Sequence, residues 1–249
     1  MNKILIISGF PKCRTTYYYE KVLGNPSFKN NSKKELRFSF KKNTFQDYIK
    51  LLKKHNYGKY YIDSSPEYIY DSNFIDIINN NKNICNIILV RDPIERLRSV
   101  LNFKKYTIGD LKFDKIDDVI TDYKNNGNNS PYYSFLERSM YEKYCWNLKS
   151  NSYIFNDNDE EKIFTQINKF FNEKFIYADI VVKNKNQTST INPIVRYIFN
   201  KIGTNFPRFI KDYLSFLKKP VKKEEFSDQS IFFLQNKLKN TYQWIKLKL

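Results

Sequence analysis

The chain has 249 residues, and its 43 Lys and Arg against 26 Asp and Glu give a formal net charge of +17. This length is sufficient for one α/β domain with a buried core. The charge favours an anionic partner, which could be nucleic acid, an acidic glycan or a nucleotide. A codon usage that favours lysine would explain the same charge without any partner. No apolar run is long enough to cross a membrane, so the sequence predicts no membrane span.

Four short apolar segments alternate with helical stretches along the chain. This alternation predicts an α/β fold, with a parallel sheet flanked by helices on both faces. We expect one domain over residues 1–249, with a loop-rich insertion at about 106–133 that is either a substrate lid or plain surface. The predicted strands are Lys3 to Ile7, Lys59 to Ile62, Asn86 to Val90 and Ser152 to Phe155. The predicted helices include Thr44 to Lys54, Asn73 to Asn80, Phe135 to Leu148 and a terminal helix within Phe226 to Leu249.

The first strand runs into a polar turn that ends in Lys12, Thr15 and Thr16. A turn between a strand and a helix directs the free N–H groups of the first helical turn at one point, where a phosphate or sulfonate can bind. A nucleotide triphosphate loop needs Gly-Lys-Ser/Thr at its end, but those places hold Arg14, Thr15 and Thr16, and the lysine lies earlier. The alternative is an ordinary strand-turn-helix capped by Thr15.

A second candidate segment follows the strand Asn86 to Val90. Arg91 stands at the end of this strand, and Asp92-Pro93 then supplies an N-cap and a proline for the next helix. Ligands of open parallel sheets bind at the carboxyl ends of strands. An arginine there can bind a phosphate through two charge-assisted hydrogen bonds.

These segments together resemble one family. The turn is similar to the pattern G-F-P-K-x-G-T-T, and Arg91 to Ser99 is similar to R-x-P-x-x-R-x-x-S. Lys34 to Phe40 resembles K-E-x-x-F-F, and Ser64 to Tyr68 resembles S-P-x-Y. The chain therefore resembles sulfotransferases that use 3′-phosphoadenosine-5′-phosphosulfate (PAPS), in the carbohydrate or heparan-sulfate-like branch. The resemblance covers residue 1 to about residue 105, and it is weak in the rest of the chain.

The resemblance implies a set of site residues. Lys12 would lie near the leaving phosphate, and Glu35 would take the proton of the acceptor hydroxyl. Sulfuryl transfer needs no metal, because a sulfonate carries less charge than a terminal phosphate. The residues expected to bind PAPS are Pro11, Lys12, Cys13, Arg14, Thr15, Thr16, Arg91 and Ser99.

The chain departs from the family pattern at three places. Arg14 replaces a glycine, Ser64 stands where some members have a lysine, and the basic loop Lys183 to Ser189 lacks the glycine of relatives that close over the nucleotide. His55 is the single histidine and competes with Glu35 for the role of base, although its place at the end of a helix favours a surface role.

Two other function classes remain open at this stage. A P-loop nucleotide kinase would share the fold, and a non-enzymatic nucleic-acid-binding protein would explain the charge. We expect no stable nucleic-acid partner, since no recognition motif is visible. The acceptor is expected to be a hydroxyl compound, with an anionic glycan among the candidates and a lipid or tyrosyl peptide as alternatives.

The cysteines give an expectation about the compartment. Cys13, Cys85 and Cys145 are far apart and lack the spacing of metal ligands. A strand begins within a few residues of Met1, without a basic and apolar leader. We therefore expect a protein of the reducing cytoplasm.

Overall fold

The structure is a computed structural model that describes residues 2–31, 34–39, 41, 43–108, 113–179 and 223–249, with the backbone alone at 189–190 and 219–220. Its residues form two compact units, and each is described by itself. The first comprises Met1–Arg96, Leu136–Lys183 and Leu234–Leu249, and the second comprises Leu97–Phe135 and Asn184–Phe233. No helix within the described ranges has the length and apolarity needed to cross a membrane.

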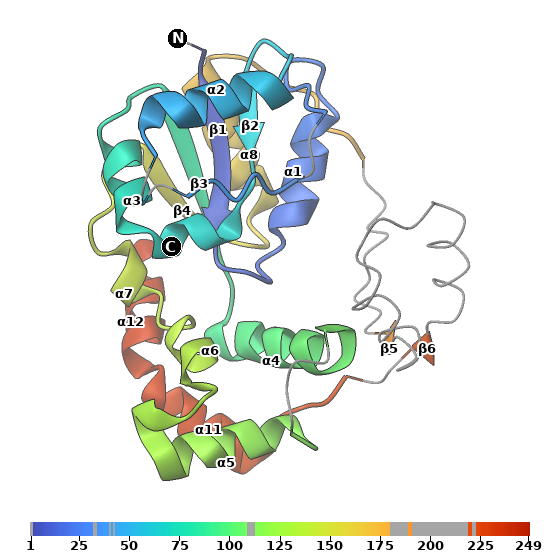
Figure 1. The fold of residues 1–249 in the computed structure, drawn as a ribbon, viewed down its shortest axis with the longest axis vertical. Helices are drawn as coiled ribbons and strands as arrows, with labels where there is room; N and C mark the ends of the chain where they lie inside the picture. The colour runs from blue at the N-terminus through green and yellow to red at the C-terminus, as the bar shows by residue number, and fades with distance from the viewer. Residues whose placement is uncertain are drawn as a thin grey trace. The chain divides into compact units, whose positions relative to one another are not determined.

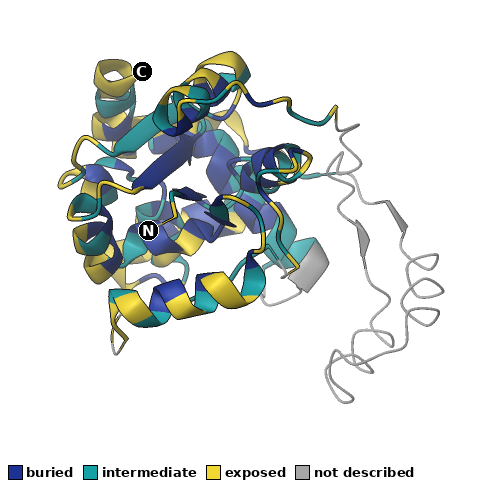
Figure 2. Ribbon diagram, turned by 90° about the horizontal axis from the view of Figure 1, so that it is seen from above, coloured by how far each residue is buried: buried dark blue, intermediate teal, exposed yellow. Residues whose placement is uncertain are grey.

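The first unit contains a four-stranded parallel sheet in the order β2-β1-β3-β4. Every residue of β1 and β3 is buried, as expected of continuous apolar runs that are covered on both faces (Figure 2). Ile4 of β1 lies between Tyr61 and Ile84 of its two neighbours, which sets the register of the three strands. The strands are β1 (Ile4–Gly9), β2 (Tyr61–Asp63), β3 (Ile84–Val90) and β4 (Ser152–Asn156).

Helices cover both faces of this sheet, which confirms the predicted fold class. Figure 1 shows α2 across the front of the strands and α8 behind them. Tyr18 of α1 packs against Phe164 of α8, with ring centroids 5.8 Å apart. In the other layer, Tyr68 of η1 contacts Tyr48 of α2 at 6.3 Å and Phe74 of α3 at 4.5 Å. These elements are α1 (Thr15–Leu23), α2 (Phe45–His55), η1 (Pro66–Tyr70), α3 (Ser72–Asn79) and α8 (Glu160–Phe171).

The helix expected over Phe135 to Leu148 is interrupted in the structure. It forms two short pieces, α6 (Tyr133–Glu137) and α7 (Glu142–Cys145). The break lets Ser139 accept a hydrogen bond of 2.8 Å from the buried guanidinium of Arg96. The hydrogen bond gives the buried guanidinium a partner within the first unit. The terminal helix is likewise two helices, α11 (Asp228–Lys237) and α12 (Lys239–Lys248).

The second unit is mainly helical. The helix α4 (Pro93–Phe103) contributes residues to both units, and the stretch expected to be rich in loops contains α5 (Ile116–Asn126). Four buried side chains of α5 recur at the helical period, a signal that the surrounding glycines and asparagines obscure: Ile116, Val119, Ile120 and Tyr123. The remaining elements are η2 (Lys104–Ile108), η3 (Gly127–Asn129), β5 (Ser189–Thr190) and β6 (Lys219–Pro220), the last two antiparallel. The expectation of one domain over residues 1–249 stays a prediction.

Candidate functional site

The loop after β1 has an unusual backbone. Gly9 has a φ of +109°, and a Cβ there would lie 2.6 Å from the backbone nitrogen and oxygen of Leu89 on β3. Lys12 and Arg14 are also left-handed, with φ of 78° and 54°. Left-handed residues within a turn direct successive amides toward a common centre, which is how backbone concavities bind anions. Because such conformations cost free energy in residues other than glycine, two of them in one loop favour a functional explanation.

The helix α1 opens onto this loop without a side-chain cap. The amides of Tyr17 and Tyr18 donate to the carbonyl of Arg14 at 3.0 and 3.3 Å. The preceding amides of Thr15 and Thr16 have no acceptor within the helix, and no side chain of Arg14 caps its start. A helix start of this kind is suited to bind an anion through its amides and its dipole.

The side chain of Arg14 serves the scaffold. Its Nη1 donates to the carbonyl of Asp157 at 3.2 Å and to Oδ1 of Asn158 at 2.8 Å, and its guanidinium lies 4.6 Å from the ring centroid of Tyr17. Arg14 thus fastens the start of α1 to the connection between β4 and α8. This gives a structural reason for an arginine where the family pattern has glycine, and its predicted contact with PAPS stays a prediction.

Cys13 is fully buried in the loop. Burial raises the pKa of the Cys13 thiol to about 12, even though the neighbouring Arg96 and Arg91 act in the opposite direction. The side chain is therefore a neutral thiol at physiological pH and fills space. Cys85 and Cys145 are buried and free as well, so none of the three forms a disulfide.

Lys34 connects the loop with the candidate base. Its Nζ lies 3.2 Å from Oγ1 of Thr15 and 3.4 Å from Oε1 of Glu35. Arg37 holds the other oxygen of Glu35 through Nε at 2.9 Å and Nη2 at 2.7 Å. The structure thus brings Glu35 to the start of α1. Sequence reasoning did not name Lys34 as a site residue, and its only signal was its place directly before Glu35.

The Lys34 ammonium is largely removed from water, with a side chain 19% exposed. Burial lowers the pKa of Lys34, and the charge of Glu35 opposes that shift. A buried cation beside the loop adds positive potential where an anion would bind, and potential is less screened there than at the surface.

The segment that carries Glu35 is held by side chains that follow β2. Three consecutive backbone amides donate to three different side chains. The pairs are Leu36 N to Asp63 Oδ1 at 3.5 Å, Arg37 N to Ser65 Oγ at 3.3 Å, and Phe38 N to Tyr68 OH at 3.0 Å. The two motifs Lys34 to Phe40 and Ser64 to Tyr68 are therefore one structural unit.

Asp63 organises this unit. It is completely buried, and it accepts hydrogen bonds of 3.0 Å from Tyr48 OH and from Ser65 Oγ. Burial raises the pKa of Asp63, while these hydrogen bonds favour its ionised form. A buried carboxyl with this many donors fixes the orientation of all of them.

Arg91 lies directly after β3, as predicted. Its carbonyl accepts a hydrogen bond of 3.0 Å from the buried Tyr141 OH. Its side chain is 31% exposed and approaches Glu95 at 3.7 Å, a weak pair. Burial raises the pKa of Asp157, and Arg91 and Arg14 oppose that shift, so both cations lie within electrostatic reach of that carboxyl.

The remaining predicted residues lie elsewhere. Ser99 is half-buried on α4 and belongs to the second unit, so its role stays a prediction. His55 ends α2 shortly before β2 begins, which places it toward the amino end of the strands, whereas the loop of residues 10–14 follows the carboxyl end of β1. Residues 183–188 of the expected nucleotide loop are outside the described ranges. Within the described ranges, no three His, Cys, Asp or Glu side chains gather as metal ligands would.

We predict that Arg14→Gly is more stable than Arg14→Ala by about 1 kcal/mol, because both variants lose the guanidinium but only alanine keeps the cost of a left-handed φ. Urea unfolding measures the difference. Glu20, which is exposed in the middle of α1, provides the control, and there alanine should be the more stable by about 1 kcal/mol. The same order at both positions would contradict the left-handed assignment.

We predict that Tyr68→Phe lowers the free energy of unfolding by about 0.5 to 1.5 kcal/mol, because the partly buried amide of Phe38 loses its acceptor. Tyr57→Phe is the control, since Tyr57 is 66% exposed. Thermal and urea unfolding of both variants provide the test. Equal stability of the two variants would show that Tyr68 does not hold the segment of Glu35.

Comparisons with known proteins place this geometry among known folds. No protein-family model and no curated protein matches the chain. A solved structure described as a sulfotransferase from Alicyclobacillus acidocaldarius superposes with a TM-score of 0.54 at 10% identity, covering 81% of this chain and 91% of that one. A second, the sulfotransferase domain from the curacin biosynthetic pathway, has a TM-score of 0.44 at 14% identity, covering 96% and 97%. The first of these similarities shows that the chain has the α/β fold of a sulfotransferase.

Proposed function

We propose that this protein transfers a sulfuryl group from PAPS to an acceptor hydroxyl, most suitably on a carbohydrate, without a metal ion and in the cytoplasm. The observation that carries the proposal is that Lys34 joins Thr15 at the start of α1 to Glu35. The loop that we assign to the donor and the carboxylate that we assign as base are thus joined by one side chain. The three free, buried thiols support a reducing compartment.

The loop has the features that a phosphosulfate needs. Lys12 belongs to the left-handed turn, and no side chain caps the start of the helix that begins at Thr15. Arg91, at the end of the neighbouring strand, offers a guanidinium to a further phosphate. We assign the 3′-phosphate of the nucleotide to Arg91, and the developing charge on the leaving phosphate to Lys12.

The reaction that these residues support is an in-line displacement. The acceptor oxygen forms a bond to sulfur while the bond from sulfur to the bridging phosphate oxygen breaks. Glu35 takes the proton of the acceptor hydroxyl, and the electron pair of the broken bond stays on the phosphate of adenosine 3′,5′-bisphosphate. Arg37 and Lys34 hold the two carboxylate oxygens of Glu35 in place and keep a cation beside the reacting groups.

We predict that the protein binds adenosine 3′,5′-bisphosphate far more tightly than AMP, and that Arg91→Ala removes about 1.5 to 3 kcal/mol of that binding through loss of a charged hydrogen bond. Titration calorimetry at fixed salt measures both affinities. Lys54→Gln, a charge loss at an exposed position of α2, should leave both unchanged. Equal affinity for the two nucleotides would remove the assignment of Arg91 to a 3′-phosphate.

We predict that Glu35→Gln loses roughly 10²- to 10⁴-fold in turnover, the usual value of general-base catalysis, while its nucleotide affinity stays unchanged. Transfer of radiolabelled sulfate from PAPS to pooled glycans, lipids and peptides provides the assay. His55→Ala is the control and should keep full turnover, and EDTA should not change the rate. A Glu35→Gln enzyme that turns over normally, or activity lost to EDTA and restored by magnesium, would contradict the mechanism.

A further inference from the structure

Large apolar side chains gather at one exposed place of the first unit. Within the described ranges, six large apolar side chains are exposed, and three of them lie at the ends of α7 and α12. Trp146, directly after α7, is 79% exposed, and Leu247 and Leu249 are 84% and 43% exposed. A single exposed apolar side chain is ordinary, whereas a cluster of them is typical of a binding surface.

The two helix ends lie together because α7 packs along α12 (Figure 1). At the start of α7, Glu142 accepts a hydrogen bond of 2.7 Å from the hydroxyl of Thr241. At the end of α7, burial raises the pKa of the Cys145 thiol to about 12, and the charge of Lys248 opposes that shift, so Lys248 lies within electrostatic reach of Cys145. The two helices therefore run in the same direction, and their last residues lie side by side.

Lysines alternate with the leucines at this end of α12. Lys246 and Lys248 are exposed and flank Leu247, and neither forms an ion pair with another residue of the described ranges. Lys149, three residues after Trp146, is a further exposed cation. Apolar side chains and positive charges are thus interleaved on one surface. We call it the helix-end surface, and it comprises Trp146, Lys149, Lys246, Leu247, Lys248 and Leu249.

The composition of the helix-end surface suits the interface of a membrane. Tryptophan favours the level of the lipid headgroups, because its ring is apolar and its N–H can hydrogen-bond. Lysine can bury its methylene groups in the same layer and keep its ammonium beside the lipid phosphates. Leucine, tryptophan and lysine together are therefore typical of helices that lie on the surface of a membrane.

A protein partner would fit this surface less well. Lysine is depleted in the contact areas between proteins relative to the rest of their surface. An apolar partner that covered Leu247 would also have to remove the ammonium groups of Lys246 and Lys248 from water, which is unfavourable without a carboxylate for each. Anionic lipids avoid that cost, because their phosphates remain hydrated and attract the lysines. Charge complementarity thus favours a membrane with anionic lipids.

We propose that the helix-end surface binds the interface of a membrane that contains anionic phospholipids. Trp146 and Leu247 enter the headgroup layer, and Lys246 and Lys248 attract the lipid phosphates. The proposal goes beyond the proposed function and does not depend on it, since no residue of the helix-end surface belongs to the donor loop or to the segment of Glu35.

Tryptophan fluorescence tests the insertion of Trp146. The chain has two tryptophans, and Trp244 is half-buried against Tyr141, with ring centroids 6.5 Å apart. Trp244→Phe therefore leaves Trp146 as the single reporter. We expect its emission to shift to shorter wavelengths with vesicles of equal parts phosphatidylcholine and phosphatidylglycerol, and not with vesicles of phosphatidylcholine alone.

The unmodified protein should show part of the same shift, so the test does not depend on the folding of Trp244→Phe. An unchanged emission of both proteins with the mixed vesicles would overturn the proposal. An equal shift with vesicles of phosphatidylcholine alone would overturn the assignment to anionic lipids.

A matched pair of variants tests Leu247. Leu247→Gln and Ile176→Gln each remove one apolar side chain, and these side chains are 84% and 83% exposed. Ile176 lies instead beside the end of α1, where its carbonyl accepts a hydrogen bond of 3.1 Å from Asn25. Sedimentation with the mixed vesicles at about 0.15 M ionic strength measures binding. We expect about a tenfold loss for Leu247→Gln and no loss for Ile176→Gln, and equal losses would overturn the proposal.

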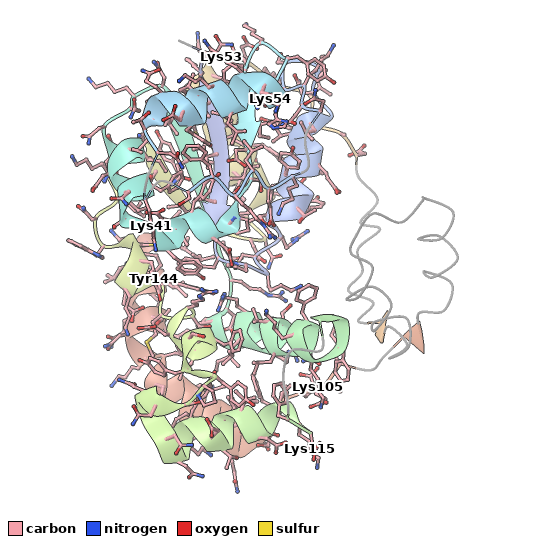
Figure 3. All side chains as sticks on the ribbon, viewed as in Figure 1. Lys41, Lys53, Lys54, Lys105, Lys115 and Tyr144 are labelled. Atoms are coloured by element: carbon pink, nitrogen blue, oxygen red, sulfur yellow. The ribbon has the colours of Figure 1, made fainter. Side chains whose placement is uncertain are left out.

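A second pair separates the helix-end surface from the general attraction of a basic protein to anionic lipids. One double variant replaces Lys246 and Lys248 by Gln. The other replaces Lys53 and Lys54 of α2, which Figure 3 labels near the top of the view, well above Tyr144 of α7. We expect at least tenfold weaker binding in the first, because each lysine near an anionic surface contributes roughly fivefold, and a clearly smaller loss in the second. Equal losses in the two double variants would overturn the proposal.

Discussion

The site depends on the close parallel pairing of β1 with β3. At the end of this pairing the backbone of Leu89 comes so near to Gly9 that no Cβ fits between them. Only glycine fits at this position, where φ is +109°, and two further left-handed residues, Lys12 and Arg14, follow before α1 begins. Backbone amides that would otherwise bond within secondary structure are left to face one point. The close pairing of the two central strands thus accounts for the glycine with which the loop after β1 begins.

A second constraint joins the loop to the rest of the site. The segment of Glu35 has no secondary structure of its own, and its amides bond to side chains that follow β2. β2 pairs directly with β1 in parallel, so the residues that follow β2 and the loop that follows β1 lie at the same end of the strands. The segment of Glu35 is therefore held at that end. The buried carboxyl of Asp63 is the centre of that arrangement. Side chains that stand on a rigid scaffold in this way keep their geometry without regular secondary structure of their own.

The cations near the site show why net charge alone says little. Arg14 and Arg96 are engaged with carbonyl and hydroxyl oxygens, and Arg37 is engaged with Glu35. Lys34 is partly buried and contacts both Glu35 and the hydroxyl of Thr15 at the start of α1. The cations behind the net charge of +17 therefore include side chains that stabilise the fold and side chains whose positive electrostatic potential is available to a ligand. Only their individual surroundings separate the two groups.

Much of the fold follows from local sequence. The apolar runs of β1 and β3 predict buried parallel strands, and Thr44 with Asp47 forms the capping box that starts α2 where the periodicity predicts it. The local pattern did not predict the break between α6 and α7, where Ser139 accepts a hydrogen bond from Arg96. The local pattern also missed α5, because its apolar residues form a short helical repeat that lies among residues typical of loops.

For the candidate site, the sequence by itself determined which residue types follow each strand, since strand ends and turn residues are local features. Arg91 and the loop from Gly9 to Thr16 stand where those features place them. Only the tertiary structure decided that Arg14 holds the connection after β4 and that Lys34 joins Thr15 to Glu35. These contacts join residues far apart in the chain, and the direction of a side chain depends on burial and partners that no local pattern specifies.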